Sequence, residues 1–299
     1  MVKKLPAFSL FVFCSLIPFA TSAATQLKGA DGVTVTLAAP AKRIVNLSPD
    51  FSELLFDIGA GDTLVGTIEY SNYPEAARKV PRIGDGFHVD LEKVVALKPD
   101  LVLAWQGGTP QALMKKLRSL GLPVLALGTH DITDIATNME TLGEATGREA
   151  AAKQAADAFL ARLAAFKARY AHETPIRVFY EVSAEPLYTV GGAQSISRLM
   201  AICSGRNIFA DLTELAPVVG LEAVLARDPE AIVTGNGEGD VAERFKLWQK
   251  WPQLSAVRAG NLYAMDDDTI SRATPRVLDA GEQLCQDLDQ ARANLAKKK

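Results

Sequence analysis

The feature that most restricts the fold is a long alanine-rich segment in the middle of the chain. The 24 residues REAAAKQAADAFLARLAAFKARYA, at 148–171, contain neither glycine nor proline. Apolar side chains recur along this segment at the spacing of one helix face: Ala156, Phe159, Leu160, Leu163, Phe166 and Tyr170. A helix of this length would be about 36 Å long, which exceeds the usual connection between two strands of a parallel sheet. The segment therefore predicts a rigid helix that joins two separate parts of the chain.

Strands and helices alternate in the sequence before this helix. Short apolar runs with β-branched residues predict strands, and amphipathic runs with capping residues predict helices between them. The expected strands are 43–47, 64–70, 99–105 and 123–128, and the expected helices are 48–58, 90–97, 110–121 and 131–147. This alternation is typical of a parallel sheet covered by helices.

The same alternation begins again after Pro175. The expected strands are 176–182, 229–235 and 261–265, and the expected helices are 195–205, 221–228, 241–249 and 274–296. The predicted fold class is α/β, with two Rossmann-like lobes, each a parallel sheet flanked by helices, joined by one long backbone α-helix. The predicted division is a signal peptide at 1–24, an N-terminal extension at 25–42, an N-terminal lobe at 43–147, an interlobe helix at 148–173 and a C-terminal lobe at 174–299.

One phrase of the sequence occurs in both halves. LEKVVALKPDLVL begins at Leu91 and LEAVLARDPEAIV begins at Leu221, so that Glu92 aligns with Glu222 without a gap. The repeat predicts the same helix–strand unit in each lobe. Convergence on a common helix–proline–strand pattern is an alternative, but the first turn of a helix only mildly prefers a carboxylate.

The first residues have the pattern of a secretory signal peptide. A basic start, MVKK, precedes the apolar run LPAFSLFVFCSLIPFA and the small residues ATSAA. Cleavage is expected after Ala23 or Ala24, and an uncleaved anchor is the alternative. Cys14 does not indicate a lipoprotein, because Phe13 occupies the position where lipid attachment needs a small residue. We expect a soluble protein exported to the periplasm.

Export leaves two cysteines in the mature chain, Cys203 and Cys285. In an oxidising compartment two remaining thiols usually form a disulfide. This one would close a loop of about 80 residues and stabilise the fold by about 4 kcal/mol in the chain-entropy model. Two separate buried thiols are the alternative. Both cysteines lie in the second half of the chain, so the disulfide would brace that half alone.

Charge and motifs argue against several functional classes. The formal net charge of −3 and the lack of a basic cluster argue against nucleic-acid binding. The sequence has no G-x-S-x-G, no G-x-x-x-x-G-K-[ST], no H-E-x-x-H and no G-x-G-x-x-G after a strand. We therefore expect no enzyme, no catalytic residue and no catalytic cofactor.

No metal site is predicted either. The three histidines, His88, His130 and His172, are well separated, whereas a transition-metal site usually needs several His or Cys ligands. A site made from His88, His130 and acids of both lobes is an alternative. The run 266–268, three aspartates, could bind a hard cation, but an acidic turn is the commoner meaning.

Aromatic and polar residues follow several of the expected strands. They lie in the segments EYSNYP, AWQGG, EPLYTVGG and DDDTISRATPR. Ligands of open α/β sheets bind outside the carboxyl ends of the strands, where these segments are expected. Ring faces with a few hydrogen-bonding groups suit a large, flat, mostly apolar ligand with a polar rim. Ordinary packing is the alternative for each ring.

These residues resemble a known family. The two lobes, the connecting helix, RIVNLSPDFSELLFDIGAGDTLVG and DLEKVVALKPDLVLAW are similar to the substrate-binding proteins of ABC importers for metal chelates, over about 43–295. That group carries cobalamin, haem and ferric siderophores, with zinc or manganese in a sister branch. EYSNYP, AWQGG, the cysteine pair and LARDPEAIV followed by DTISRATPR resemble its cobalamin-binding members in particular.

The resemblance implies a corrin held edge-in between the lobes by aromatic contacts. The positions it implies for ligand binding are Asp50, Tyr70, Phe87, Trp105, Tyr188, Asp268 and Arg272. Phe87 stands near a position where the family has tryptophan, and Ala216 stands where a second tryptophan is expected. An aromatic contact adds only about 0.5–1.5 kcal/mol beyond area burial, so binding can survive both losses.

The resemblance also gives the repeated glutamates a role. Glu92 and Glu222 would dock onto arginines of the two permease subunits of an inner-membrane ABC importer, which works with its ATPase. The implied function is a monomeric periplasmic protein that captures cobalamin or a related corrinoid, limits lobe closure with its stiff helix, and performs no catalysis. A haem or ferric-siderophore receptor of the same group is the alternative, and a nucleotide-dependent α/β enzyme is a remote one.

Overall fold

Two parallel sheets form the two lobes of the molecule. The computed structural model describes residues 24–85, 88–237 and 240–298. The N-terminal lobe is built on the sheet β4-β3-β5-β6 and the C-terminal lobe on the sheet β10-β7-β11-β12. Every pairing within these two sheets is parallel. The predicted α/β class, with helix-flanked parallel sheets in two lobes, is therefore confirmed.

The strands are short and the helices lie between them in the chain. The strands are β3 (Ile44–Asn46), β4 (Leu64–Thr67), β5 (Leu101–Trp105), β6 (Val124–Leu127), β7 (Ile176–Glu181), β10 (Gly205–Asn207), β11 (Ala231–Gly235) and β12 (Leu262–Met265). The helices are α1 (Pro49–Asp57), α2 (Leu91–Ala96), α3 (Gln111–Ser119), α4 (Asp134–Thr146), α5 (Glu149–Tyr170), α6 (Ser195–Ile202), α7 (Leu221–Arg227), α8 (Val241–Gln249), α9 (Ser255–Ala259), α10 (Asp267–Ile270) and α11 (Val277–Ala296).

The two sheets have the same topology. In each lobe the first parallel strand is flanked by the second and the third, and the fourth strand pairs with the third. The repeated phrase forms α2 and β5 in one lobe and α7 and β11 in the other, so both copies occupy the same place. Val94 and Val224, which align in the repeat, are both fully buried. The repeat in the sequence thus corresponds to a repeat in the structure.

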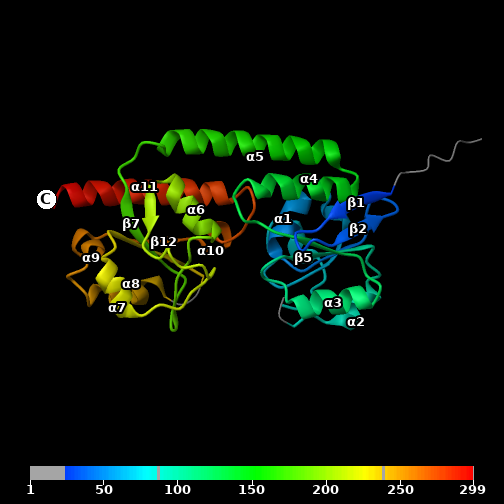
Figure 1. The fold of residues 1–299 in the computed structure, drawn as a ribbon, viewed down its shortest axis with the longest axis horizontal. Coiled ribbons are helices and arrows are strands. Elements are labelled where there is room, and N and C mark those ends of the chain that lie inside the picture. The colour runs from blue at the N-terminus through cyan, green and yellow to red at the C-terminus, as the bar shows by residue number, and fades with distance from the viewer. Residues whose placement is uncertain (1–23, 86–87, 238–239, 299) are drawn as a thin grey trace, which may run out of the picture.

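The long helix α5 runs along one side of both lobes (Figure 1). It packs against α4 and α11 through Ala152, Ala156, Phe159, Leu163, Phe166 and Tyr170, which are all buried. Leu160, expected on this face, is exposed, because it lies roughly 80° around the helix from the centre of the buried stripe. One apolar cluster continues from the N-terminal lobe through α4, α5 and α11 into the C-terminal lobe. The lobes therefore share a packed core on the side of α5.

An antiparallel hairpin precedes the first lobe. Its strands are β1 (Thr25–Lys28) and β2 (Thr34–Leu37), and it packs on α4 and β6 with Leu27, Val35 and Leu37 buried. The sequence had suggested only an extension there. The predicted signal peptide, apart from Ala24, lies outside the described residues. Across the described ranges, no helix is long and apolar enough to cross a membrane.

The predicted disulfide is confirmed. Cys203 follows the last residue of α6, Cys285 lies within α11, and the two are bonded across 82 residues of sequence. Both half-cystines are fully buried. The bond braces the C-terminal lobe and does not join the two lobes.

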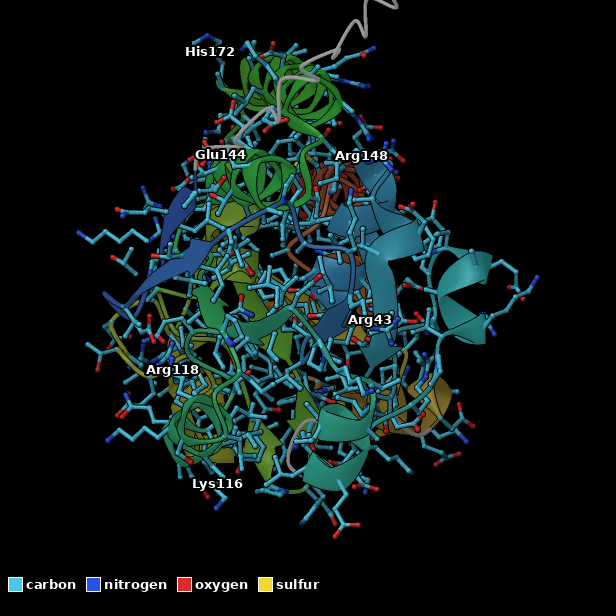
Figure 2. All side chains as sticks on the ribbon, turned by 90° about the vertical axis from the view of Figure 1, so that its right-hand side faces the viewer. Arg43, Lys116, Arg118, Glu144, Arg148 and His172 are labelled. Carbon is cyan, nitrogen blue, oxygen red and sulfur yellow. A yellow bond between two sulfur atoms is a disulfide. The ribbon has the colours of Figure 1, made fainter. Side chains whose placement is uncertain are left out.

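The face opposite α5 carries the short helices of both lobes. In Figure 1, α2 and α3 of the N-terminal lobe and α7 and α8 of the C-terminal lobe all lie on the side away from α5. The end-on view agrees for the N-terminal lobe: His172, just after α5, and Lys116, on α3, lie at opposite extremes (Figure 2). A surface that touches both lobes away from α5 would therefore meet α2 and α7 together.

Candidate functional site

A cleft lies between the lobes at the carboxyl ends of the strands. It consists of two cavities of about 640 and 230 Å³, and Trp105 lines both. The larger is lined by Trp105 and Thr129 of the N-terminal lobe and by Tyr180, Val182, Ser183, Tyr188, Val190, Ala193, Gln194, Ser195, Ile196, Leu215, Ala216, Asp267 and Ser271 of the C-terminal lobe. The smaller is lined by Leu47, Ser48, Pro49, Ile68, Glu69, Tyr70, Asp85, Trp105, Gly108 and Thr109. We call these two cavities the binding cleft.

Trp105 is held at the centre of the binding cleft by the turn that follows it. It is the last residue of β5, and its side chain is 40% exposed. The amides of Gly108 and Thr109 both donate to the Trp105 carbonyl, at 3.2 and 2.9 Å. A Cβ on Gly108 would lie 1.7 Å from Trp105 Cε3, so the ring lies directly on this glycine. Glycine is therefore required at 108 for the ring to keep this position.

Tyr70 borders the smaller cavity from a strained backbone. It is 71% exposed and has φ of 63°, a left-handed conformation that costs a non-glycine residue energy. Its carbonyl accepts hydrogen bonds from the Asn72 amide at 2.9 Å and from Arg272 Nη2 at 2.8 Å. Contacts with the other lobe thus hold the loop that presents the Tyr70 ring.

The C-terminal wall comes from β7 and the short hairpin after it, β8 (Ser183–Ala184) and β9 (Leu187–Tyr188). Tyr180, Val182 and Tyr188 line the binding cleft from this segment. Burial raises the pKa of the Tyr180 phenol, so the hydroxyl is a neutral hydrogen-bonding group. Tyr188 was predicted, but Tyr180 was missed, because a tyrosine within the apolar run IRVFYEV is first taken as core.

Polar groups complete the floor on the C-terminal side. Gln194 and Ser195 lie at the start of α6, and Asp267 lies at the start of α10. The Gly237 amide donates to Asp267 Oδ2 at 2.7 Å, and burial raises the pKa of the Asp267 carboxyl. Asp268, in the same acidic run, is the residue predicted to contact the ligand. The neighbour Asp267 lines the cavity instead, because a one-residue step along a helix turns the side chain by about 100°.

Arg272 joins the two lobes through the hydrogen bonds of a buried side chain. It is 6% exposed, and its Nη1 donates to Glu53 Oε1 and to Asn72 Oδ1, both at 2.8 Å. Its Nη2 donates to the Tyr70 carbonyl and to Asp268 Oδ1, both at 2.8 Å. Asn72 Nδ2 also donates to Asp268 Oδ2 at 2.7 Å. The structure therefore directs the polar groups of Arg272 and Asp268 to protein partners, and neither residue lines the two cavities.

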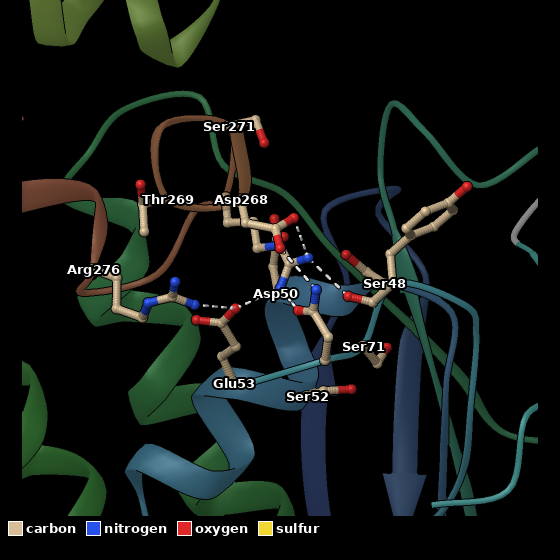
Figure 3. A network of polar contacts seen from close by, with 12 residues as sticks. Ser48, Asp50, Ser52, Glu53, Ser71, Asp268, Thr269, Ser271 and Arg276 are labelled. Carbon is tan, nitrogen blue, oxygen red and sulfur yellow. Dashed lines mark hydrogen bonds and ion pairs between the residues drawn. The ribbon is translucent and has the colours of Figure 1, made fainter. Parts of the chain in front are cut away.

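Glu53 is the acidic centre of this contact. It is 1% exposed, and Arg276 Nη1 donates to its Oε1 at 3.1 Å. Figure 3 shows Arg276 reaching from the C-terminal lobe towards Glu53 on α1. Two arginines near one buried carboxylate supply the opposite charge that it needs in a dry site. We call Glu53, Asn72, Asp268, Arg272 and Arg276 the interlobe network.

Asp50 lies beside the interlobe network, in the first turn of α1. The Ala273 amide donates to Asp50 Oδ2 at 3.3 Å across the lobe boundary. Burial raises the pKa of Asp50 to about 6, although the Ala273 amide and the Arg272 charge both act to lower it. Asp50 was predicted to contact the ligand, and the structure places it next to Pro49, which lines the smaller cavity.

The two repeated glutamates are both exposed, and the helices that carry them lie on the face opposite α5. Glu92 and Glu222 are each the second residue of their helix, α2 and α7. Both helices lie on that face in Figure 1. The predicted Phe87 lies outside the described residues. Ala216, where the resemblance leads one to expect tryptophan, lines the larger cavity, so the small side chain leaves that wall open.

Among the described residues, no group of three His, Cys, Asp or Glu side chains could hold a metal ion. The acidic run 266–268 instead caps α10: Asp266 Oδ1 accepts from the Thr269 amide at 2.9 Å.

Comparisons with known proteins agree with the arrangement of the lobes. The sequence profile of a family described as "Periplasmic binding protein" matches residues 44–269. A vitamin B12-binding protein of Vibrio cholerae is 37% identical over 246 residues, which cover 82% of this chain and 88% of the relative.

Two solved structures are similar in fold. The periplasmic vitamin B12 binding protein BtuF of Vibrio cholerae superposes with a TM-score of 0.79 at 36% identity, over 85% of this chain and 98% of that one. The periplasmic heme-binding protein RhuT from Roseiflexus sp. RS-1 superposes with a TM-score of 0.75 at 22% identity, over 84% of this chain and 99% of that one. At that identity the second likeness concerns the fold alone.

Proposed function

Because this chain belongs to the periplasmic binding protein family, we propose that it captures cobalamin or a related corrinoid between its lobes and delivers it to an ABC importer. The observation that carries the choice of ligand is the 37% identity with a vitamin B12-binding protein across 82% of the chain. The likeness to the haem-binding protein, at 22% identity, supports no ligand. The relatives are binding proteins, and the receptor is accordingly expected to leave its ligand chemically unchanged.

The proposed contacts with the corrin are ring faces on both sides of the binding cleft. Trp105 and Tyr70 supply them from the N-terminal lobe and Tyr188 from the C-terminal lobe. Phe87, which lies outside the described residues, is proposed as a further ring contact on the resemblance alone. Aromatic faces and aliphatic walls suit the flat, largely apolar ring of a corrinoid. The polar groups at the floor, Tyr180 and Asp267 among them, suit the amides at its edge.

Asp50, Asp268 and Arg272 are proposed to act mainly by holding the walls of the binding cleft in place. The hydrogen bonds from Arg272 to Asn72 Oδ1 and to the Tyr70 carbonyl fix the Tyr70 loop against the C-terminal lobe, and its bond to Glu53 fixes α1. The α5 side is closed by a shared core. We therefore expect the lobes to move by only a few degrees on binding, and crystals of the free and loaded protein that differ by a large hinge rotation would contradict this.

The test of ligand choice is retention of a chromophore. The purified protein is incubated with cyanocobalamin, haem or a ferric siderophore, desalted, and its absorption spectrum is recorded. Retention of cyanocobalamin at about one per chain is expected. Retention of haem or siderophore alone would overturn the assignment. For haem, an axial ligand would be required, so Tyr70→Ala or His88→Ala would then abolish binding, whereas cobalamin binding should tolerate either change in part.

Docking is proposed to use Glu92 and Glu222. Their exposure on one face, one per lobe, supports symmetric pairing with cations on a permease dimer driven by its ATPase. Reversal of both residues to lysine should leave cyanocobalamin retention unchanged and stop uptake by cells that depend on this receptor. Loss of retention would instead assign the two carboxylates to the ligand.

The receptor is proposed to work as a monomer in the periplasm after removal of a signal peptide ending at Ala23 or Ala24. The family and its relatives support the compartment. The intact mass of the exported protein checks the cleavage, and its sedimentation checks the monomer. A mass that retains the first residues, or a stable dimer, would contradict these two points.

A further inference from the structure

The C-terminal wall of the binding cleft brings two polar side chains together at the carboxyl end of the sheet. Tyr180 is the penultimate residue of β7, and Asp267 is the first residue of α10, shortly after β12. Both strands pair with β11 in parallel, so their carboxyl ends flank the end of β11. Tyr180 and Asp267 both line the larger cavity. We call these two residues the polar pair.

The Tyr180 hydroxyl is open to the binding cleft and unpaired within the described residues. The Tyr180 side chain is only 2% exposed, and it lines the larger cavity. Its oxygen is not one of the enclosed polar atoms that lack a partner, so it keeps surface that a ligand can reach. Burial, with an added contribution from the Asp267 charge, raises the pKa of the phenol, which therefore keeps its proton. The hydroxyl is thus a reachable hydrogen-bond donor.

The Asp267 carboxyl lies on the backbone at the end of β11. The Gly237 amide donates to Asp267 Oδ2 at 2.7 Å. A Cβ would lie 1.5 Å from Oδ1 if it were added to Gly235 and 2.5 Å from Oδ2 if it were added to Gly237, so the carboxyl needs both glycines for this position. Oδ1 accepts no hydrogen bond from a described residue, and it is not enclosed. One carboxyl oxygen is therefore held in place, and the other is a reachable acceptor.

Two neighbours favour the charged form of the Asp267 carboxyl. Burial raises its pKa, but the Gly237 hydrogen bond and the charge of Arg244 both act to lower it. Arg244 is 7% exposed and is fixed at the end of β11, since it donates to Thr234 Oγ1 at 2.7 Å and to the Gly235 carbonyl. Partly exposed aspartates titrate well below about pH 8. At that pH Asp267 accepts hydrogen bonds and repels anions.

A donor beside an acceptor is the complement of a primary amide. The amide oxygen can accept from the Tyr180 hydroxyl, and the amide N–H can donate to Asp267 Oδ1. A carboxylate in the same place could accept from Tyr180, but it would offer no N–H and would bring a second negative charge towards Asp267. Like charges placed together in a site with little water are strongly unfavourable. The polar pair therefore distinguishes two groups of almost equal size and shape.

We propose that the polar pair selects among corrinoids by binding one primary amide on the rim of the corrin and rejecting a carboxylate at that position. This inference rests on the proposed function, because it assigns a specificity to the same cleft. The rings of Trp105, Tyr70 and Tyr188 contact the face of the macrocycle and do not distinguish the two groups on its rim. The polar pair thus supplies a selection that the aromatic walls lack.

Calorimetry with the monocarboxylic acids of cyanocobalamin tests the proposal on the whole protein. Each acid has one primary amide replaced by a carboxylate, and one acid is used for each primary amide of the ligand. At pH 8 the acid altered at the amide that meets the polar pair should bind at least about tenfold more weakly than cyanocobalamin. Acids altered at amides exposed on the rim should bind within about threefold of it, because exposed charges contribute little.

Asp267→Asn should remove the selection. The asparagine keeps the shape of the side chain, and when its oxygen accepts from the Gly237 amide its N–H₂ group is turned towards the ligand. The loss of affinity of the sensitive acid, relative to cyanocobalamin, should then fall below about threefold, because the repelling charge is gone. Asp287→Asn is the matched control: this partly buried carboxyl of α11 also has its pKa raised by burial, but it does not line the larger cavity. It should leave the selection unchanged.

Tyr180→Phe removes the donor of the polar pair and keeps the ring. Cyanocobalamin and the sensitive acid should both bind about tenfold more weakly. Tyr263→Phe is its control, because the Tyr263 hydroxyl bonds Asn261 Oδ1 at 3.3 Å and Tyr263 does not line the larger cavity. Unchanged binding in a folded Tyr180→Phe variant would contradict the proposal, and if that variant does not fold, Asp267→Asn still decides.

Two results with the acids would overturn the proposal. One is equal binding of cyanocobalamin and all of its acids, and the other is a loss of affinity that persists in Asp267→Asn. A protein that binds no cyanocobalamin at all would contradict the corrinoid function, and the selection with it. The two failures are therefore distinguishable.

Discussion

Replacement of Arg272 by methionine removes the centre of the interlobe network while keeping most of the side-chain volume. The change deletes four hydrogen bonds of 2.8 Å and leaves Glu53 buried with Arg276 as its remaining cationic partner. Removal of one partner of a buried ion pair costs about 3–5 kcal/mol, because the other charge stays in the dry site. We expect the free energy of unfolding, from urea titration followed by circular dichroism, to fall by that amount.

Arg162→Met is the matched control. Arg162 pairs with Asp279 and, at 3.7 Å, with Glu282, and all three side chains are well exposed. Exposed pairs contribute about 0–1 kcal/mol, so this variant should lose little. The double variant Glu53→Gln/Arg272→Met should recover more than about 1 kcal/mol over Arg272→Met alone, because it no longer buries a charge without its main partner. A loss in Arg272→Met no larger than in Arg162→Met would refute the reasoning.

Three further changes have outcomes that follow from the structure. Replacement of Cys203 and Cys285 by serine should lower the free energy of unfolding in urea by about 4 kcal/mol, since the bond closes a loop of 82 residues; a loss below about 1 kcal/mol would contradict this. Gly108→Ala should push the Trp105 ring out of place and weaken cyanocobalamin binding by about tenfold, measured by calorimetry; an unchanged Kd would show that the ring does not contact the ligand. The pKa of Asp50 is raised to about 6 by burial, so the folded state holds this proton more tightly than the unfolded state, and stability decreases as pH rises from about 4 to about 6. Asp50→Asn should therefore gain about 3 kcal/mol on the wild type at pH 7 and little at pH 4, in urea titrations at both values, and an equal difference at the two would contradict the assignment.

Much of the fold could be predicted because local patterns and tertiary structure agree. The helix start at Asp90 is an example: its carboxylate accepts from the Lys93 amide at 3.0 Å, as the sequence of α2 suggests. The stretch without glycine or proline forms α5, and the helical spacing of its apolar residues correctly predicted which face is buried. Leu160 was the exception, because periodicity alone does not tell where a buried stripe ends.

The small elements could not be predicted from these patterns. The hairpin β1–β2 has strands of four residues, and its register depends on packing against α4 and β6. The strands β8 and β9 have two residues each, too few for an alternation to be recognised. Short strands depend on their neighbours more than on their own sequence.

Local sequence was enough to predict some residues of the binding cleft but not those that depend on distant partners. Trp105 could be found because a tryptophan beside two glycines after a strand indicates a ring on a tight turn, as the structure has it. The partners of Arg272 could not be found, because Glu53 and Asn72 lie about two hundred residues away in sequence. The choice between Asp267 and Asp268 depended on the direction of side chains on a one-turn helix, which sequence does not fix.

The crystal structure of the complex with cyanocobalamin is the most direct test of corrinoid capture between the lobes. Density for the corrin ring is expected between Trp105 and Tyr188, with Arg272 still bonded to Glu53 and Asn72. A corrin bound elsewhere on the molecule, or a binding cleft that stays empty when cyanocobalamin is in excess, would contradict it.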